Sequence, residues 1–145
     1  MDEKERGPHR EYRTDQIAVQ WEPAFCIHTA NCIRSLPDVF RPQDRPWVHL
    51  DVASADAIAA AVLRCPTGAL HFRRLDGGPQ ERTPAETTVR VVANGPLVLR
   101  GDIEIRAGDG ETIRRDTRVT LCRCGRSSNK PFCDNTHRLI GFQAP

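Results

Sequence analysis

The sequence CRCGRSSNKPFCDNTH, residues 122–137, places three cysteines and one histidine within a short stretch of chain. These residues are Cys122, Cys124, Cys133 and His137. Thiolate sulfur prefers zinc and iron-sulfur centres to hard cations, and imidazole nitrogen suits the same metals. Only one residue separates the first two cysteines, whereas structural zinc sites usually take paired cysteines from longer loops. The stretch therefore predicts a metal centre, and both zinc and an iron-sulfur cluster remain open.

The residues between and around these ligands can support them. Asp134 is a favourable residue for the start of a helix, and four positions separate Cys133 from His137. One helical turn would therefore carry both ligands on one face. The hydroxyl groups of Ser127 and Thr136 can orient metal ligands through hydrogen bonds. We expect Ser127, Asp134 and Thr136 to surround the centre as hydrogen-bonding groups, and we expect no catalytic acid among them.

The same stretch resembles the CDGSH iron-sulfur domain, whose pattern is Cys-x-Cys-x2-Ser/Thr-x3-Pro-x-Cys-Asp-Gly-Ser/Thr/Ala-His. The positions that agree in register are Cys122, Cys124, Ser127, Pro131, Cys133, Asp134, Thr136 and His137. The one departure is Asn135, where the family has glycine, and asparagine tolerates a left-handed backbone. The resemblance implies a [2Fe-2S] cluster with three cysteine ligands and one histidine ligand in a small β-rich fold. A zinc-bound module with the same ligands is the alternative.

A second group of cysteines lies nearer the amino terminus. Bacterial ferredoxins hold a cluster with a Cys-x2-Cys-x2-Cys run and a remote cysteine that precedes proline. On that template Cys26 and Cys32 are the outer cysteines, Thr29 takes the middle position, and Cys65 is the remote ligand, followed by proline. Three thiolates suit a [3Fe-4S] cluster. They also suit a [4Fe-4S] cluster if His28, a hydroxyl or water completes it, and three buried structural cysteines are the alternative.

The pattern between these cysteines indicates a small α/β unit. Apolar alternation predicts a strand over residues 17–21, and Ser54 can cap a helix that carries Cys65 on its apolar face. A turn or short helix over 35–40 and strands over 47–50 and 69–73 complete the expected elements. This part resembles the divergent single-cluster ferredoxin domain that is fused to CDGSH modules in bacteria.

The chain as a whole is expected to be an α+β protein of two small domains. Alternating apolar residues after position 88 predict a small antiparallel sheet that leads into the metal loop, with strands near 89–91, 97–99, 103–105 and 118–121. Residues 139–142 are expected to close the core of this sheet. The expected organisation is a flexible tail (1–11), a ferredoxin-like cluster domain (12–75), a linker too polar to pack (76–88) and a CDGSH-type domain (89–145).

Composition excludes several classes of function. The net charge is +2, and the 21 Lys and Arg residues form no basic stripe, so we expect no nucleic-acid binding. The longest apolar run, residues 57–63, is too short to cross a bilayer. The first residues resemble no signal peptide, which predicts a cytoplasmic bacterial protein with six reduced cysteines.

No catalytic triad, phosphate loop or dinucleotide motif is present, so we expect no enzyme. The expected function is electron transfer or cluster transfer, with a redox protein or a cluster-acceptor protein as the partner. An electron-supplying component of an oxidoreductase system and a zinc-stabilised interaction module are the alternatives. CDGSH proteins with one motif are commonly homodimers, so the resemblance also allows a homodimer. Since a bound His137 is neutral, acid should speed cluster release below about pH 7.

Overall fold

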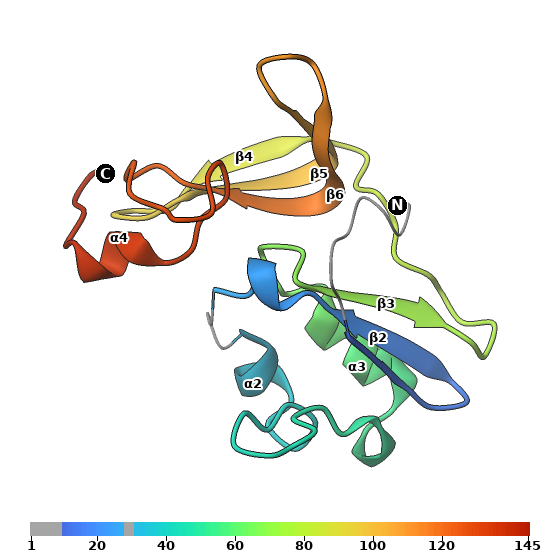
Figure 1. The fold of residues 1–145 in the computed structure, drawn as a ribbon. Helices are drawn as coiled ribbons and strands as arrows, with labels where there is room; N and C mark the ends of the chain where they lie inside the picture. Colours follow the sequence, from blue (N-terminus) through green and yellow to red (C-terminus); the bar gives the residue numbers. More distant parts are fainter. Residues whose placement is uncertain (1–9, 28–30) are drawn as a thin grey trace.

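The computed structural model describes residues 10–27 and 31–145, and in these ranges it contains two three-stranded antiparallel sheets with a few short helices (Figure 1). The expected tail lies mostly outside the described residues, as do His28 and Thr29. The expectation of a flexible tail is wrong for Arg10 and Glu11, because they begin a strand and pair with Trp21 and Gln20.

The first sheet has the strand order β1-β2-β3, and all its neighbours are antiparallel. Its strands are β1 (Arg10–Arg13), β2 (Ile17–Trp21) and β3 (Leu70–Arg74). The strand predicted over residues 17–21 is confirmed. Ile17 and Val19 are buried, and they belong to a core that includes Phe40, Ile58 and Val62.

Short helices fill the connection between β2 and β3. They are η1 (Pro23–Phe25), α2 (Asn31–Ser35), η2 (Leu50–Val52) and α3 (Ala55–Val62). The prediction of the helix cap is confirmed, because the Ser54 hydroxyl accepts a hydrogen bond from the Ala57 N–H at 3.1 Å. This helix ends at Val62, so Cys65 lies beyond it and not on its face.

The turn expected over residues 35–40 is confirmed at residues 37–39, and helix α2, which begins at Asn31 and includes Cys32, precedes it. One other expectation for this half is wrong. No strand forms over residues 47–50, where Val48 makes an isolated bridge to Phe40 and Leu50 already begins η2. Burial explains the apolar pattern there, because Val48 and Leu50 both pack into the core.

The second sheet has the order β4-β5-β6. Its strands are β4 (Thr88–Val91), β5 (Leu97–Arg106) and β6 (Thr112–Leu121), and α4 (Thr136–Leu139) follows near the carboxyl end. The two short strands expected around Leu97 and Ile103 are one long strand. A register shift between Arg100 and Ile103 interrupts its pairing, and Gly101 takes a φ of +145° there.

The second half has a small core of its own. Its buried cluster is Ile103, Val119 and Phe132, and Phe25 of the first half packs against it. The rings of Phe25 and Phe132 meet edge to face with centroids 4.9 Å apart. The second half therefore completes its core with a residue from the first.

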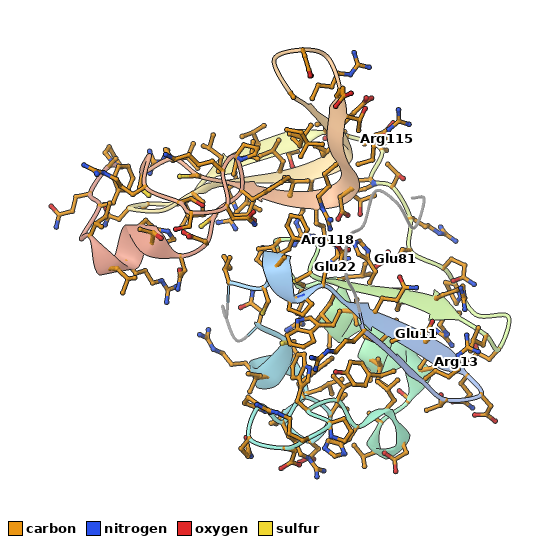
Figure 2. The ribbon with its side chains drawn as sticks, viewed as in Figure 1. Glu11, Arg13, Glu22, Glu81, Arg115 and Arg118 are labelled. Atoms are coloured by element: carbon orange, nitrogen blue, oxygen red, sulfur yellow. The ribbon has the colours of Figure 1, made fainter. Side chains whose placement is uncertain are left out.

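The two halves also meet through polar side chains. Figure 2 shows Glu22, Glu81 and Arg118 gathered between the two sheets, while Glu11 and Arg13 lie on the outer strand of the first sheet. Over the described ranges, no helix combines the length and the apolar character needed to cross a membrane.

Candidate metal centres

The four predicted ligands of the C-terminal loop form two pairs. The sulfurs of Cys122 and Cys124 lie 3.8 Å apart, and the Cys133 sulfur lies 3.6 Å from Nδ1 of His137. Bond lengths of about 2.3 Å to sulfur and about 2.1 Å to nitrogen place two ligands of one tetrahedral metal about 3.6–3.8 Å apart. Among the described residues, no three acidic, cysteine or histidine side chains surround one metal-ion position. Each pair has the separation that one metal of a two-metal centre requires.

Hydrogen bonds hold this loop in shape. The Ser127 hydroxyl donates to the Phe132 carbonyl at 2.6 Å and accepts from the Asn129 N–H at 3.0 Å. The Asp134 carboxylate accepts from the backbone N–H groups of Ser128 and Thr136 at 2.8 Å and 3.1 Å. These contacts connect the segment that follows Cys124 to the segment that carries Cys133. Ser127 and Asp134 therefore brace the loop that carries the ligands, and the role of Ser127, Asp134 and Thr136 around a cluster stays a prediction.

The backbone of the loop also acts on the sulfurs. Burial raises the pKa of the Cys122 thiol, but the N–H groups of Ser127 and Gly125 outweigh burial and lower this pKa overall. The N–H of Asn135 points at the Cys133 sulfur at 3.4 Å. Donors aimed at sulfur stabilise thiolate, which is the form that binds metal. The loop thus favours ligation at Cys122 before any metal arrives.

The segment that carries His137 departs from the expected helical turn. Asn135 has a φ of +75°, which confirms the expected left-handed backbone, and α4 begins only at the next residue. Cys133 and His137 come together across this turn and not along one helix. Burial lowers the pKa of His137 below its ordinary value, with Arg138 nearby adding to the effect. We therefore expect protonation of an unligated His137 only at a more acidic pH than the sequence analysis assumed.

The residues after His137 do not close the core. Leu139 is 87% exposed and Ile140 is 49% exposed, which contradicts the expectation for residues 139–142. Phe142 instead packs beneath the Arg123 guanidinium, at 5.3 Å from the ring centroid. Arg123 also donates to the carbonyls of Gly95 and Ala144. Asn94 binds the N–H and the carbonyl of Ala144 as well, so Arg123 and Asn94 together hold the C-terminal segment while Leu139 and Ile140 face outward.

Cys26, Cys32 and Cys65 line a single cavity of about 880 Å³. All six cysteines lie in the described part of the chain, and none of them is in a disulfide. Burial and the neighbouring thiols of Cys65 and Cys26 raise the pKa of Cys32 to about 11. The structure thus brings these three sulfurs together although they span forty positions of the chain.

The walls of this cavity fit an inorganic cluster. Trp21 and Trp47 line it, and their indole N–H groups are buried with no acceptor among the described residues. A buried N–H without an acceptor costs about 1–3 kcal/mol, and cluster sulfide is an acceptor that would remove this cost. Iron would also replace the mutual repulsion of three thiolates with attraction. The residues present therefore suit a cluster held by three cysteines.

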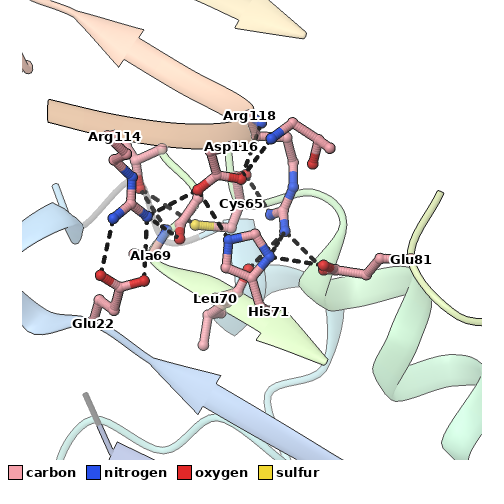
Figure 3. A network of polar contacts seen from close by, with 12 residues as sticks. Glu22, Cys65, Ala69, Leu70, His71, Glu81, Arg114, Asp116 and Arg118 are labelled. Atoms are coloured by element: carbon pink, nitrogen blue, oxygen red, sulfur yellow. Dashed lines mark hydrogen bonds and ion pairs between the residues drawn. The ribbon is translucent and has the colours of Figure 1, made fainter. Parts of the chain in front are cut away.

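A buried ionic network joins the two halves, and sequence reasoning missed it (Figure 3). Arg114 is 1% exposed and makes two hydrogen bonds to Glu22, at 3.0 and 3.2 Å, and one to Asp116 at 2.8 Å. Asp116 also accepts from His71 at 3.0 Å. Because Arg114 and Asp116 come from β6 while Glu22 and His71 come from the first half, this network docks the two domains.

Arg118 extends the network toward the N-terminal metal site, which contains Cys65. Its guanidinium donates to the backbone carbonyls of Val62, Cys65 and Leu70 at 2.7–2.9 Å. It also donates to Glu81 at 2.9 Å. The segment 76–88 was expected to be too polar to pack, and that expectation is wrong for Glu81. Its carboxylate is held between Arg118 and His71.

His71 balances the charge of this network. Two arginines, Arg114 and Arg118, face three carboxylates, so the buried set is neutral only when His71 is protonated. Burial lowers the pKa of His71, but hydrogen bonds to Asp116 and Glu81 outweigh it and raise this pKa to about 9. His71 is therefore a cation at neutral pH.

One sequence signal could have revealed the interface. Arg114, Asp116, Arg118 and Thr120 occupy alternate positions of β6, and all four are buried. In a strand, alternate positions share one face. Apolar alternation is the usual mark of a half-buried strand, whereas β6 buries an alternating polar face of mixed charge.

Comparisons with known proteins match both halves. Residues 12–75 match the model of the divergent 4Fe-4S mono-cluster family, and residues 94–138 match the model of the iron-binding zinc finger of CDGSH type. The uncharacterized protein YjdI of Escherichia coli K12 is 31% identical over 67 residues, which are 46% of this chain and 88% of YjdI. YjdI of Escherichia coli O157:H7 matches equally well. The chain is thus an iron-sulfur protein of the YjdI family that joins a divergent 4Fe-4S mono-cluster domain to a CDGSH-type domain.

Proposed function

We propose that this protein is a two-cluster electron carrier. Cys122, Cys124, Cys133 and His137 hold a [2Fe-2S] cluster, with one pair of ligands on each iron. The second cluster, held by Cys26, Cys32 and Cys65 in a ferredoxin-like domain, is [4Fe-4S], with [3Fe-4S] as the alternative. The protein acts in the reducing cytoplasm, is not itself an enzyme, and exchanges electrons with a redox protein.

The division of the C-terminal ligands into two pairs carries this proposal. Each pair has the separation of two ligands of one metal, 3.8 Å and 3.6 Å, and among the described residues no group of three such side chains shares one metal position. A single tetrahedral zinc ion requires all four ligands at similar mutual distances. The pairing supports a two-iron cluster over a zinc-stabilised interaction module. A histidine ligand carries less negative charge than thiolate and raises the potential of such a cluster.

Transfer of a whole cluster to an acceptor protein is the second candidate function. It is favoured by the position of His137, whose imidazole can leave the metal when it takes up a proton. The loop between the ligands is also partly open, because Gly125 and Arg126 are exposed. Both candidates use the same ligands, so they differ only in whether iron stays on the chain.

The test is an anaerobic titration of the protein with a one-electron reductant, followed by EPR spectroscopy. We expect uptake of about two electrons per chain, one per cluster, with iron retained through repeated cycles. A Cys122→Ser variant should lose the C-terminal signal and accept about one electron, and Cys32→Ser should do the same for the other cluster. Loss of iron during cycling would favour cluster transfer. Steady consumption of a small substrate would favour an oxidoreductase component.

A further inference from the structure

Thr120 connects the two candidate metal centres through two hydrogen bonds. Its hydroxyl donates to the carbonyl of Pro66 at 2.8 Å, and Pro66 directly follows Cys65. Its own carbonyl accepts from the Cys133 N–H at 3.0 Å. Cys133 is therefore hydrogen-bonded to Thr120 directly, and Cys65 is connected to Thr120 through the next residue, Pro66.

This connection is partly buried and is held at more than one point. Thr120 is buried, and Cys133 is buried beside it. Arg118, on the same face of β6, holds the carbonyl of Cys65 at 2.8 Å. The strand thus fixes the Cys65–Pro66 segment at two points, while β6 leads directly into the loop of the other centre. Buried groups with several partners stay in one arrangement, so the separation of the two centres is set by this contact.

We propose that Thr120 provides the path by which electrons pass between the two clusters. An electron couples more strongly along covalent bonds and short hydrogen bonds than across a van der Waals gap or solvent. The step needs no proton and breaks no bond. One electron leaves the N-terminal cluster, which an external one-electron donor has reduced, and arrives at the C-terminal cluster. This inference rests on the proposed function, because it requires both clusters.

The ligands favour one direction. A histidine ligand in place of a thiolate raises the potential of a [2Fe-2S] cluster. Cys26, Cys32 and Cys65 give the N-terminal cluster thiolate ligands, whereas His137 serves the C-terminal cluster. The electron therefore runs from the Cys65 side to the Cys133 side, and the chain accepts electrons at one domain and delivers them from the other.

A second contact offers a competing path. Phe25 precedes Cys26, Phe132 precedes Cys133, and the two rings touch edge to face. This is a contact between rings with no hydrogen bond across it, so it couples more weakly than the Thr120 connection. It also packs the small core of the second half, and we assign it that structural role.

The experiment compares Thr120→Val with Thr120→Ser in the iron-loaded full chain. Valine has the shape of threonine but no hydroxyl, and serine keeps the hydroxyl. Both variants keep the backbone carbonyl that accepts from Cys133. A laser flash on a flavin delivers one electron to the protein. The absorbance of each cluster is then followed over time at several protein concentrations, because only the intramolecular step has a rate that does not depend on concentration. Thr120→Ala deletes the same hydroxyl and replaces the valine variant if that one does not fold.

We expect the intramolecular rate to fall by an order of magnitude in Thr120→Val and to stay near the parent rate in Thr120→Ser. The two reduction potentials and the dipolar magnetic coupling between the reduced clusters, which reports their separation, should not change, since a merely structural effect would move them. An unchanged rate in Thr120→Val, or a loss of rate in Phe25→Leu alone, would overturn the inference. Failure of the proposed function is a different result, because one or both cluster signals would then be missing from the parent protein.

Discussion

Replacement of Arg114 by methionine should lower the free energy of unfolding by about 3–5 kcal/mol. The guanidinium of Arg114 is buried and bonded to both Glu22 and Asp116. Methionine fills similar space but removes the cation that binds Glu22 in the interior, and it leaves Asp116 with His71 as its remaining partner. Removing one partner of a buried ionic group is costly because the remaining charge stays desolvated. Loss of the Arg114 contacts should separate the two domains before either domain unfolds.

Arg115 provides the matched control for this variant. It is the next residue of β6, but its side chain is 58% exposed and forms an ion pair with Glu104 at 3.5 Å. Arg115→Met should change stability by about 0.5 kcal/mol or less. Denaturant unfolding of the iron-loaded protein measures the free energy of unfolding of both variants. Equal effects of the two substitutions would show that the Arg114 network does not dock the domains.

The second large effect concerns pH and His71. The folded protein raises the pKa of His71 from an ordinary value of 6.5 to about 9. A raised histidine pKa stabilises the fold fully below the ordinary value, and this contribution is lost as pH rises through the folded value. The contribution is on the order of 3 kcal/mol. Above about pH 9, neutral His71 leaves three carboxylates facing two arginines, and the domain interface should loosen.

Denaturant unfolding between about pH 7 and about pH 10 measures this effect, with stability expected to fall as pH rises. A His71→Gln variant keeps hydrogen-bonding groups but has no proton to lose in this range. Its stability should be lower at neutral pH and should vary much less with pH. A parent protein whose stability is flat across this interval would contradict a protonated His71 at the interface.

Local chemistry made several features predictable from sequence. Ser54 precedes an apolar helix and caps it, because its hydroxyl can accept the N–H that the first turn leaves unpaired. Asn135 takes the left-handed backbone that glycine takes in the resembling family. The ligands of the C-terminal loop lie close in sequence, so their approach needed only local turns. In each case the determining contacts lie within a few residues.

The rest depended on contacts between distant segments. Nothing near Glu22 or Glu81 in the sequence indicates that an arginine of β6 binds each of them. Leu139 and Ile140 are apolar and looked like core residues, but the end of α4 that carries them lies at the surface. Val48 and Leu50 looked like a strand, because the alternation that marks a strand also arises when a loop buries every second residue.

Chemical analysis of freshly purified protein for iron, sulfide and zinc tests the central claim most directly, namely that this chain holds two iron-sulfur clusters. Anaerobic purification should yield about five or six irons per chain, about six inorganic sulfides, and no stoichiometric zinc. Protein that contains one zinc per chain and no sulfide would contradict the account.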